Sequence, residues 1–559
     1  MPLRHEPSSL TITADARLDN RGTLLPLLAP DRPGIGDGEL ILLAFLKWGQ
    51  DCLANLLGDF AFAIWDERNR TLFAARDPIG MRQLCYAYRP GKFLVFATDP
   101  EAVIEHFAVD RTVSLRRVAQ FLDGLESADL RATFFEGVHR LEAAHTLSLT
   151  ERGFVSRRYW SAEMPPPLRL KSDGDYAEAL YEELRGAVAP RLRSYTPVGA
   201  TLSGGMDSTA ICAVAAGMLG ETGRGRLKTF SVVGPDPSSC VETRSIHAAL
   251  AIANIDPTLI RMDDPGDILE QLVEQGRDVA DPFDTLMTVP RAVYANARSS
   301  GINVVFDGVG GDMTLSLPSH VARLLKRWRI AEAWREAVGE NRYWGPSWQP
   351  WRAFGRGLLQ AYAPPLWTMR QAVREWAHDR KMKSDGRITA DLASATGLNE
   401  CRRVVRTRDR NILNVDAEEL LRQVSNPSLI VGRERYDRVA AAFGVEPRDA
   451  FLDLRFIRFC LSLPTEQLQC EGYPKPILRR AMAGRVPDAV RWRRGKEHLG
   501  QQMNRNLMAN VWQDKEAKEL ESFLDANKAS RADLRLGPVE RHNLRIERLS
   551  LNHWLKRHR

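Results

Sequence analysis

The sequence contains no apolar run long enough to cross a bilayer, and the longest clear one extends only from Leu40 to Leu46. The first ten residues, MPLRHEPSSL, lack the apolar core of a secretory signal. Seven cysteines occur without any CxxC spacing, which argues against a disulfide framework and against a zinc site. These absences predict a cytoplasmic protein that has no membrane partner.

Length and composition indicate an ordinary globular protein of two domains. A chain of 559 residues is too long for one typical core, and 44% hydrophobic with 27% charged residues is a common composition. The net charge of +7 is small for this length. It is weak evidence for nucleic acid, which we do not expect as a partner.

Two adjacent glycines separate a short apolar run from a helical pattern. Residues 197–202 precede Gly204 and Gly205, and the segment from Asp207 onward, DSTAICAVAAGML, reads as a helix. Glycines let backbone N–H groups approach an anion, and the helix adds the positive end of its dipole. The pattern predicts a phosphate-binding loop. An ordinary turn capped by Asp207 or Ser208 is the alternative.

The run Ser203-Gly-Gly-Met-Asp-Ser208 resembles the pyrophosphate loop of the ATP pyrophosphatases, and no Gly-Lys-Ser/Thr of the common ATPase loop follows it. The resemblance implies that Asp207 binds magnesium and that Ser203 and Ser208 donate to phosphate oxygens, with Gly204 and Gly205 beside them. It also implies that ATP and Mg²⁺ are the cofactors, and that pyrophosphate leaves while AMP stays on a carboxylate.

The first part of the chain reads as short strands with helices between them. Apolar or β-branched runs predict strands at 10–13, 61–65, 71–75, 93–97 and 146–149, and helical spacing covers 38–49. These elements predict an α+β domain over residues 1–165. A proline-rich and then polar segment follows as a short linker.

The runs Gly58–Asp66 and Ala75–Gly80 resemble the glutamine amidotransferase domain of asparagine synthetase. In that class II domain a cysteine directly after the initiator methionine attacks glutamine, with the terminal amine as base. Position 2 here is Pro2, and the glutamine-holding Asn-Gly-Glu segment aligns with Asp15-Ala16-Arg17. We therefore expect a truncated, degenerate domain without glutaminase activity.

Cys52 and Cys85 are the cysteines of this first part, and neither has a terminal amine beside it. We interpret both as buried structural residues.

The second part, residues 172–559, alternates strands and helices between positions 227 and 306. That rhythm predicts α/β architecture, a parallel sheet that binds ligands at the carboxyl ends of its strands. The resemblance implies the adenine nucleotide alpha hydrolase-like fold of the synthetases. It places Val232 beside the adenine and Thr201 on the other side of the base.

A second glycine-rich segment, Phe306–Ser316, follows another apolar strand. It resembles the Ser-Gly-X-Gly-Ser-Asp loop of asparagine synthetase, which implies that Asp312 is the second magnesium ligand and that Asp307 and Gly308 lie near the nucleotide. A plain strand-to-helix turn is the alternative. Val309 stands where asparagine synthetase has glutamate and β-lactam synthetase has tyrosine, so the base must lie elsewhere.

An insertion at about 321–394 is helical, basic and rich in tryptophan. Interleaved arginine and aromatic side chains can stack nucleic-acid bases, form a core with solvated basic faces, or line a groove that holds a polypeptide. For most of the tryptophans we expect the core.

Two lysines near the C-terminus are candidates for stabilising negative charge. The segments Gly472–Met482 and Arg491–His498 resemble the Lys-X-X-Leu-Arg helix and the later Arg-X-Lys segment of the synthetases. The resemblance implies that Lys496 stabilises the pyrophosphate and the tetrahedral intermediate, with Lys475 assisting at the phosphates. His498 is expected to be a solvated histidine.

A complete synthetase half beside an inactive amidotransferase half resembles the lasso peptide cyclases. That resemblance implies a precursor peptide whose Asp or Glu side chain is adenylated and joined to its N-terminal amine, with a leader peptidase and a leader-binding protein as candidate partners. Three alternatives stay open: a glutamine-dependent asparagine synthetase with an incomplete N-terminus, a noncatalytic nucleotide or peptide binder, and a nucleic-acid-modifying enzyme.

Overall fold

The computed structural model describes residues 2–237, 240–264, 266–317, 319–345, 347–385, 388–410, 417–495, 503, 518–525 and 537–558. The chain divides into two compact units. Unit 1 comprises Met1–Ala162, Ser425–Arg438 and His558–Arg559, and unit 2 comprises Glu163–Val424 and Val439–Arg557. Unit 1 thus includes an internal segment that the sequence-based division assigned to the second domain.

Unit 1 is built on two antiparallel sheets. Their strand orders are β1(Leu3–His5)-β2(Leu10–Leu18)-β3(Gly58–Asp66)-β4(Thr71–Arg76)-β8(His145–Thr150)-β9(Gly153–Arg158) and β6(Phe93–Ala97)-β5(Cys85–Arg89)-β7(His139–Arg140). The helices are α1(Arg21–Leu28), α2(Asp37–Trp48), α3(Pro100–Ile104) and α4(Leu115–Leu122). The five predicted strands and the predicted helix are confirmed. Strands β1, β5, β7 and β9 were not predicted.

Strand β3 is buried on both faces. Large and small side chains alternate along it, so the large ones point to one face of the sheet and the small ones to the other. Phe60 and Phe62 belong to one core cluster with Leu40 and Ile41 of α2. The intervening alanines of the strand belong to a second cluster that includes residues of β4 and β5. The repeated Phe-Ala pattern therefore fits one face to a helix and the other to a second sheet.

The segment Ser425–Arg438 joins unit 1 through a buried carboxylate. Glu434 accepts a hydrogen bond from Arg76 Nη2 at 2.8 Å and lies 3.4 Å from Arg140 Nε, and all three side chains are buried. Burial alone raises the pKa of Glu434, but the charges of Arg140 and Arg76 outweigh it and hold the pKa below its ordinary value. Contacts of this sequence separation leave no local pattern to predict them from.

Unit 2 contains a parallel sheet of order β12(Ile255–Arg261)-β11(Leu227–Val233)-β10(Val198–Thr201)-β13(Val304–Asp307)-β14(Glu446–Asp449). After β10 the chain adds β11 and β12 on one side of it, and later adds β13 and β14 on the other side. The neighbours β10 and β13 therefore flank a topological switch point, where open parallel sheets bind ligands. The predicted strand–helix alternation is confirmed, and β14 was not predicted.

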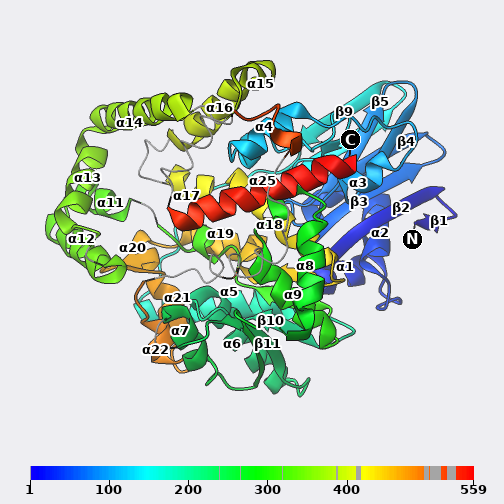
Figure 1. Cartoon of the computed structure of the whole chain (residues 1–559). Helices are drawn as coiled ribbons and strands as arrows, with labels where there is room; N and C mark the ends of the chain where they lie inside the picture. The colour runs from blue at the N-terminus through cyan, green and yellow to red at the C-terminus, as the bar shows by residue number, and fades with distance from the viewer. Residues whose placement is uncertain are drawn as a thin grey trace. The chain divides into compact units, whose positions relative to one another are not determined.

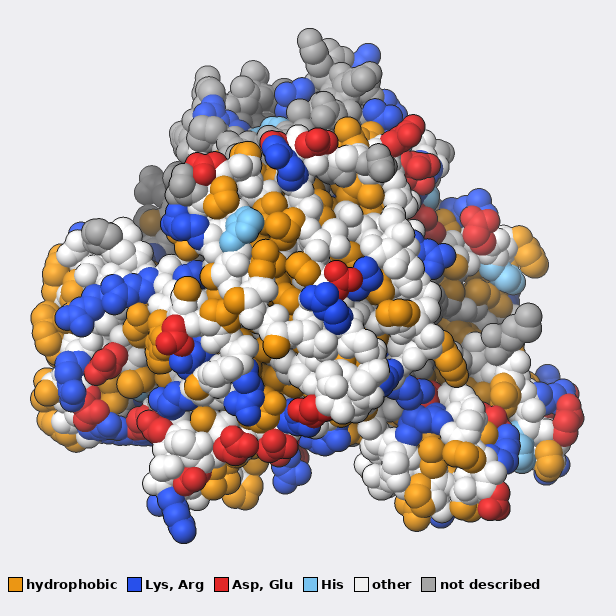
Figure 2. Space-filling view, turned by 90° about the horizontal axis from the view of Figure 1, so that it is seen from below, with side chains coloured by type: hydrophobic (Ala, Val, Ile, Leu, Met, Phe, Trp, Pro, Cys, Tyr) orange, Lys and Arg blue, Asp and Glu red, His pale blue; other side chains and the backbone are white. Residues whose placement is uncertain are grey.

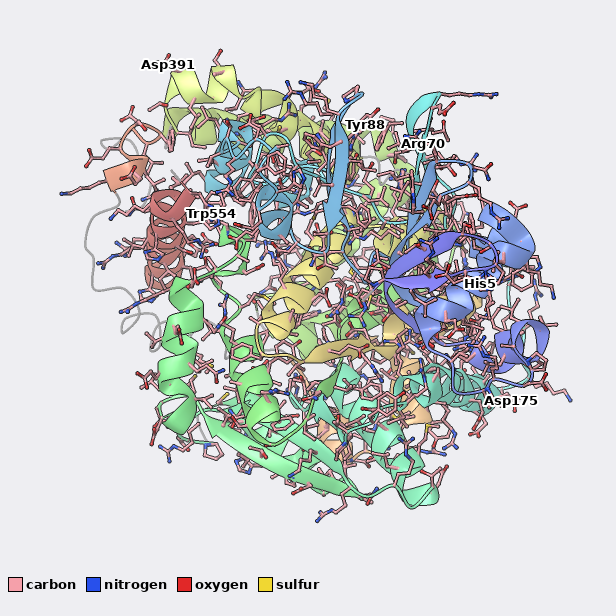
Figure 3. All side chains as sticks on the ribbon, turned by 90° about the vertical axis from the view of Figure 1, so that its right-hand side faces the viewer. His5, Arg70, Tyr88, Asp175, Asp391 and Trp554 are labelled. Atoms are coloured by element: carbon pink, nitrogen blue, oxygen red, sulfur yellow. The ribbon has the colours of Figure 1, made fainter. Side chains whose placement is uncertain are left out.

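The helices around this sheet include α5(Asp173–Arg191), α6(Met206–Glu221), α7(Val241–Ala249), α8(Leu269–Arg277) and α9(Thr288–Ser299). Helix α5 begins with a capping box, in which Ser172 and Asp175 each accept a hydrogen bond from the other's backbone N–H. Trp554 of α25(Pro538–His558) is buried, and its indole N–H donates to the carbonyl of Ala280 (Figure 3).

Helix α18(Pro427–Ala441) begins in the internal segment of unit 1, and its last turn belongs to unit 2. The further elements of unit 2, in chain order, are α10(Gly311–Thr314), α16(Leu398–Arg410), α17(Ala417–Val424), α19(Leu454–Ser462), α20(Thr465–Leu468), β15(Gln469–Cys470), β16(Tyr473–Pro474), α21(Pro476–Ala481) and α22(Asp488–Arg491). Strands β15 and β16 form a two-stranded antiparallel hairpin.

The insertion folds as α11(His320–Lys326), α12(Ile330–Trp344), α13(Pro350–Tyr362), α14(Pro364–Asp385) and α15(Ala390–Ala395) (Figure 1). The expectation that most of its tryptophans form a core was wrong. Trp367 is buried, the side chain of Trp376 lies outside the described residues, and the others, Trp328, Trp334, Trp344, Trp348 and Trp351, are exposed. The helices pack instead through small and aliphatic residues, with Phe354 partly buried against them.

Surface charge agrees with the small net charge of the sequence. On the face shown in Figure 2, positive and negative side chains are interspersed among hydrophobic ones. Among the described helices, none combines the length and the apolar character that crossing a membrane requires.

We predict that Glu434→Gln lowers the free energy of unfolding by about 3–5 kcal/mol, because it removes the buried carboxylate charge that Arg76 and Arg140 both contact. The matched variant Glu221→Gln, which breaks an exposed pair with Arg185, should cost no more than about 1 kcal/mol. Because the folded-state pKa of Glu434 is lowered, its contribution is present above pH 4.5 and is lost as pH falls through that pKa. Thermal unfolding of both variants from pH 7 downward tests this, and equal shifts would contradict it.

Candidate active site

The loop after β10 has a backbone that only glycine fits. Gly204 has a φ of 69°, and a Cβ there would lie 2.7 Å from the backbone nitrogen of Ile246. The hydroxyl of Ser245 donates to the carbonyl of Gly204 at 2.7 Å. Helix α7 thus holds the loop from behind, and the predicted strand–loop–helix is confirmed.

The loop hydroxyls are ordered beside the start of α6. Ser203 Oγ and Ser208 Oγ are 2.8 Å apart, and the backbone N–H of Ser203 donates to Ser208 Oγ at 3.2 Å. The helix begins at Met206, directly after Gly205. Hydroxyl donors at the positive end of a helix dipole suit a phosphate group.

The second glycine-rich loop packs directly against the first. A Cβ on Gly308 would lie 2.7 Å from the backbone nitrogen of Ser208, and one on Gly311 would lie 2.6 Å from Cγ of Asp207. Both positions therefore exclude larger residues. This approach brings Asp312, in the short helix α10, near the start of α6.

Lys475 joins the two predicted magnesium ligands. Its Nζ lies 2.5 Å from Asp207 Oδ2 and 2.6 Å from Asp312 Oδ1, and the side chain is buried. Burial alone lowers the pKa of Lys475, but the charges of Asp207 and Asp312 outweigh it and raise the pKa above its ordinary value. Two carboxylates from distant loops therefore hold one charged ammonium.

This set of side chains fits a magnesium-bound nucleotide. Within the described residues, Asp207 Oδ1 is buried without a hydrogen-bond partner, whereas the side chain of Asp312 is largely exposed. Magnesium usually takes one or two protein carboxylates and completes its shell with phosphate and water. No group of three or more metal-ligating side chains occurs in the described part of the chain.

The remaining predicted residues lie at the same edge of the sheet, with one exception. Asp307, at the end of β13, accepts hydrogen bonds from Thr201 Oγ1 and from the Tyr294 hydroxyl, both at 2.7 Å. Buried Asp307 thus links β13 to the end of β10. No sequence pattern indicated that Tyr294 belongs to this site. Val232 is buried near the end of β11. The exception is Lys496, which with His498 lies outside the described residues.

A close packing contact that the sequence did not reveal positions the hairpin before Lys475. A Cβ on Gly339 of α12 would lie 2.1 Å from the carbonyl oxygen of Glu471. Glu336, one helical turn earlier, accepts hydrogen bonds from the backbone N–H of Gly472 and from Gln469 Nε2, both at 2.9 Å. Burial raises the pKa of Glu336 to about 7. A glycine inside a helical pattern was the available signal.

Unit 1 holds its two cysteines as neutral thiols. Burial raises the pKa of Cys52 and of Cys85 to about 12, and thiolate is the nucleophilic form. Arg17, in the segment aligned with the glutamine-holding residues, forms buried ion pairs with Asp19 and Asp59.

A parallel sheet with two glycine loops at its switch point, two carboxylates and a buried lysine defines the class of nucleotide-binding α/β domains. Comparison with protein families matches residues 179–555 to the family described as asparagine synthase and residues 31–160 to a glutamine amidotransferase domain. The chain belongs to the asparagine synthase family. Homologues in this family are ATP-dependent carbon–nitrogen ligases, so the predicted enzyme class is confirmed.

Similar curated proteins include asparagine synthetase [glutamine-hydrolyzing] 3 of Bacillus subtilis, 25% identical over 82% of this chain and 70% of that protein. Amidase chyE of Penicillium rubens is 28% identical over 50% of this chain and 42% of its own length. A putative asparagine synthetase of Mycobacterium tuberculosis is 35% identical over 32% of this chain and 28% of its own. The chain thus spans less than half of the last two.

Among solved structures, a glutamine phosphoribosylpyrophosphate amidotransferase from B. subtilis covers 46% of this chain and 63% of its own, at 15% identity and a TM-score of 0.21. A likeness of that size carries no argument.

We predict that Gly311→Ala weakens magnesium-dependent ATP binding by about tenfold or more, because the new methyl group pushes Asp207 from its position. Gly217→Ala, inside α6 with open space around it, should leave ATP binding unchanged. Calorimetric titration of both variants with ATP and magnesium measures this. Equal affinities in the two would contradict the close approach of the loops.

We predict that Gly339→Ala displaces Lys475 by forcing the β15–β16 hairpin away from α12. Activity should fall at least about tenfold with little change in thermal stability of the sheet, because a misplacement of about 1 Å is costly in a site. Gly355→Ala, in α13 with nothing near its Cβ, is the control. Pyrophosphate release by the two variants decides the matter, and equal rates would show that the contact does not position Lys475.

Proposed function

We propose that the chain is an AMP-forming amide ligase that adenylates an Asp or Glu side chain of a precursor peptide and closes a macrolactam with the peptide's N-terminal amine. The observation that carries the ligase assignment is the convergence of Asp207, Asp312 and Lys475 on one point beside the glycine loops.

In this proposal each group of the site has a distinct task. Asp207 and Asp312 hold magnesium, which when bound neutralises phosphate charge. Ser203, Ser208 and the loop N–H groups hold the ATP phosphates. A substrate carboxylate oxygen then bonds to the α-phosphorus while the bond to the departing pyrophosphate breaks. The amine next bonds to the acyl carbon, AMP leaves, and the amine proton passes to a base.

Lys475 takes the leading charge-stabilising role in this scheme. Its buried ammonium is fixed beside both carboxylates, and a positioned cation in a site closed to water stabilises a leaving pyrophosphate. Lys475 also has a φ of 60°, a conformation that is costly for a residue other than glycine and that is typical of functional sites. The role of Lys496 stays a prediction.

One feature favours an amine supplied by the substrate over ammonia. Val309 stands in the second loop, where the resemblance implies glutamate for asparagine synthesis. A leader peptidase and a leader-binding protein belong to this proposal as the proteins that would prepare the peptide.

The second candidate is a glutamine-dependent asparagine synthetase. It is favoured by the similarity to the B. subtilis protein of that name, which extends over both units. The two candidates share the adenylation step and differ in the nucleophile.

We predict that synthetic peptides with a free N-terminal amine and one Glu or Asp at varied positions lose one water when incubated with the chain, ATP and magnesium. If the carboxylate carries ¹⁸O, one labelled oxygen must appear in AMP, because AMP leaves with that oxygen. Mass spectrometry of peptide and AMP measures both. Lys475→Ala should reduce AMP formation by about 100-fold or more.

Acetylating the peptide N-terminus is the matched control, since it removes the nucleophile and leaves the carboxylate intact. Asparagine formed from aspartate with glutamate released from glutamine would support the second candidate and contradict the first. No label in AMP with any acid would contradict the ligase assignment itself.

A further inference from the structure

Five aromatic rings form a continuous line from the insertion, through the β15–β16 hairpin that precedes Lys475, to Trp492 just after α22. We define this aromatic wall as Trp348, Trp344, Tyr343, Tyr473 and Trp492. Successive ring centroids lie 6.3, 4.8, 5.6 and 5.5 Å apart, and the last three contacts are edge-to-face, the favourable arrangement for aromatic pairs. Tyr473, the fourth ring of the wall, stands two residues before Lys475 in the sequence.

The wall is exposed although its residues are among the most hydrophobic. Trp344, Trp348 and Trp492 are 44%, 37% and 41% exposed, whereas Tyr343 is buried and fixes the line from behind. Exposed tryptophans held in place by buried and half-buried tyrosines mark a place where another molecule binds.

Guanidinium groups lie along the wall. Arg356 stands over the ring of Trp348 at 5.2 Å, and Arg479 stands over Tyr343 and Tyr473 at 5.9 and 5.3 Å. Arg494 donates to the Tyr473 hydroxyl at 3.0 Å.

Arg479 is buried and donates to the backbone carbonyls of Pro474 and Arg491. Arg356 and Arg494 are exposed, and within the described part of the chain no carboxylate forms an ion pair with either. These two arginines are therefore available to carboxylates from outside.

We propose that the aromatic wall binds an acidic, apolar stretch of a polypeptide substrate and leads its carboxylate to Lys475. This inference rests on the proposed function, because it names the substrate of that site. Apolar side chains of the polypeptide would pack on the exposed ring edges, and its acidic side chains would pair with the guanidinium groups of the exposed arginines.

A single-stranded nucleic acid is the other class of ligand that aromatic and arginine side chains can hold. Base stacking needs open ring faces. Guanidinium groups stand over one face of Trp348, Tyr343 and Tyr473, and edge-to-face packing occupies more of the tyrosine rings. The observations therefore favour a peptide.

The test measures binding of fluorescein-labelled twelve-residue peptides to the full chain by anisotropy, without ATP. One peptide alternates glutamate with leucine and phenylalanine, a second has lysine in place of glutamate, and a third has serine in place of the apolar residues. The acidic, apolar peptide should bind at least about tenfold more tightly than the other two. Similar affinities for all three would overturn the proposal.

Trp344→Ala and Trp492→Ala should each weaken binding of the acidic, apolar peptide by about tenfold. Trp351→Ala is the matched control, because Trp351 is 61% exposed on α13 and lies outside the wall. Trp344→Phe and Trp492→Phe keep a ring and should restore most of the affinity. If Trp351→Ala weakens binding as much as the wall variants do, or if a dT12 oligonucleotide binds more tightly than the peptide, the proposal is wrong.

Binding without ATP separates this inference from the proposed function. If the peptides bind as predicted but no acid yields labelled AMP, the ligase assignment fails and the wall stands. If a peptide is adenylated while the wall variants keep wild-type affinity and KM for it, the wall proposal fails and the ligase assignment stands. In the active enzyme the wall variants should raise KM for the peptide and leave KM for ATP unchanged.

Discussion

The buried ammonium of Lys475, held between Asp207 and Asp312, is the interaction on which the rest of the site depends. Two carboxylates near one another repel, and a buried cation between them offsets that repulsion. Glycines of the second loop serve this arrangement, because a methyl group at Gly308 or Gly311 would separate the two loops. In this site the positive charge of Lys475 offsets the negative charges of Asp207 and Asp312, and close backbone packing of the loops keeps the three groups together.

The insertion also helps to position Lys475. Glu336 and Gly339 of α12 contact the β15–β16 hairpin, and the backbone N–H of Lys475 donates to the carbonyl of Leu468 just before that hairpin. The helix therefore both carries part of the aromatic wall and holds the residues that precede the lysine. A polypeptide seated on the wall would lie against the element that sets the position of Lys475.

Much of the fold was predictable from the sequence, because strands such as β3 and loops such as Ser203–Ser208 carry strong local patterns. Family resemblance implied that Asp207 and Asp312 share one magnesium ion; the structure brings both carboxylates to Lys475 Nζ, and their role as metal ligands stays a prediction. Local patterns could not reveal the inclusion of Ser425–Arg438 in unit 1, since it depends on buried ion pairs between distant residues. Local patterns also gave a wrong prediction for the tryptophans of the insertion. Most of them were expected in a core, but small and aliphatic residues such as alanine and leucine form that core and most of the described indoles are exposed.

The central claim is that Asp207 and Asp312 hold one metal ion with a nucleotide. Calorimetric titration of magnesium-dependent ATP binding in Asp207→Asn, Asp312→Asn and the double variant tests it most directly. If the two carboxylates share one ion, the double variant should lose little more affinity than either single variant, because residues that act as a unit are not additive. Losses that simply add would mean two independent sites and would contradict the account.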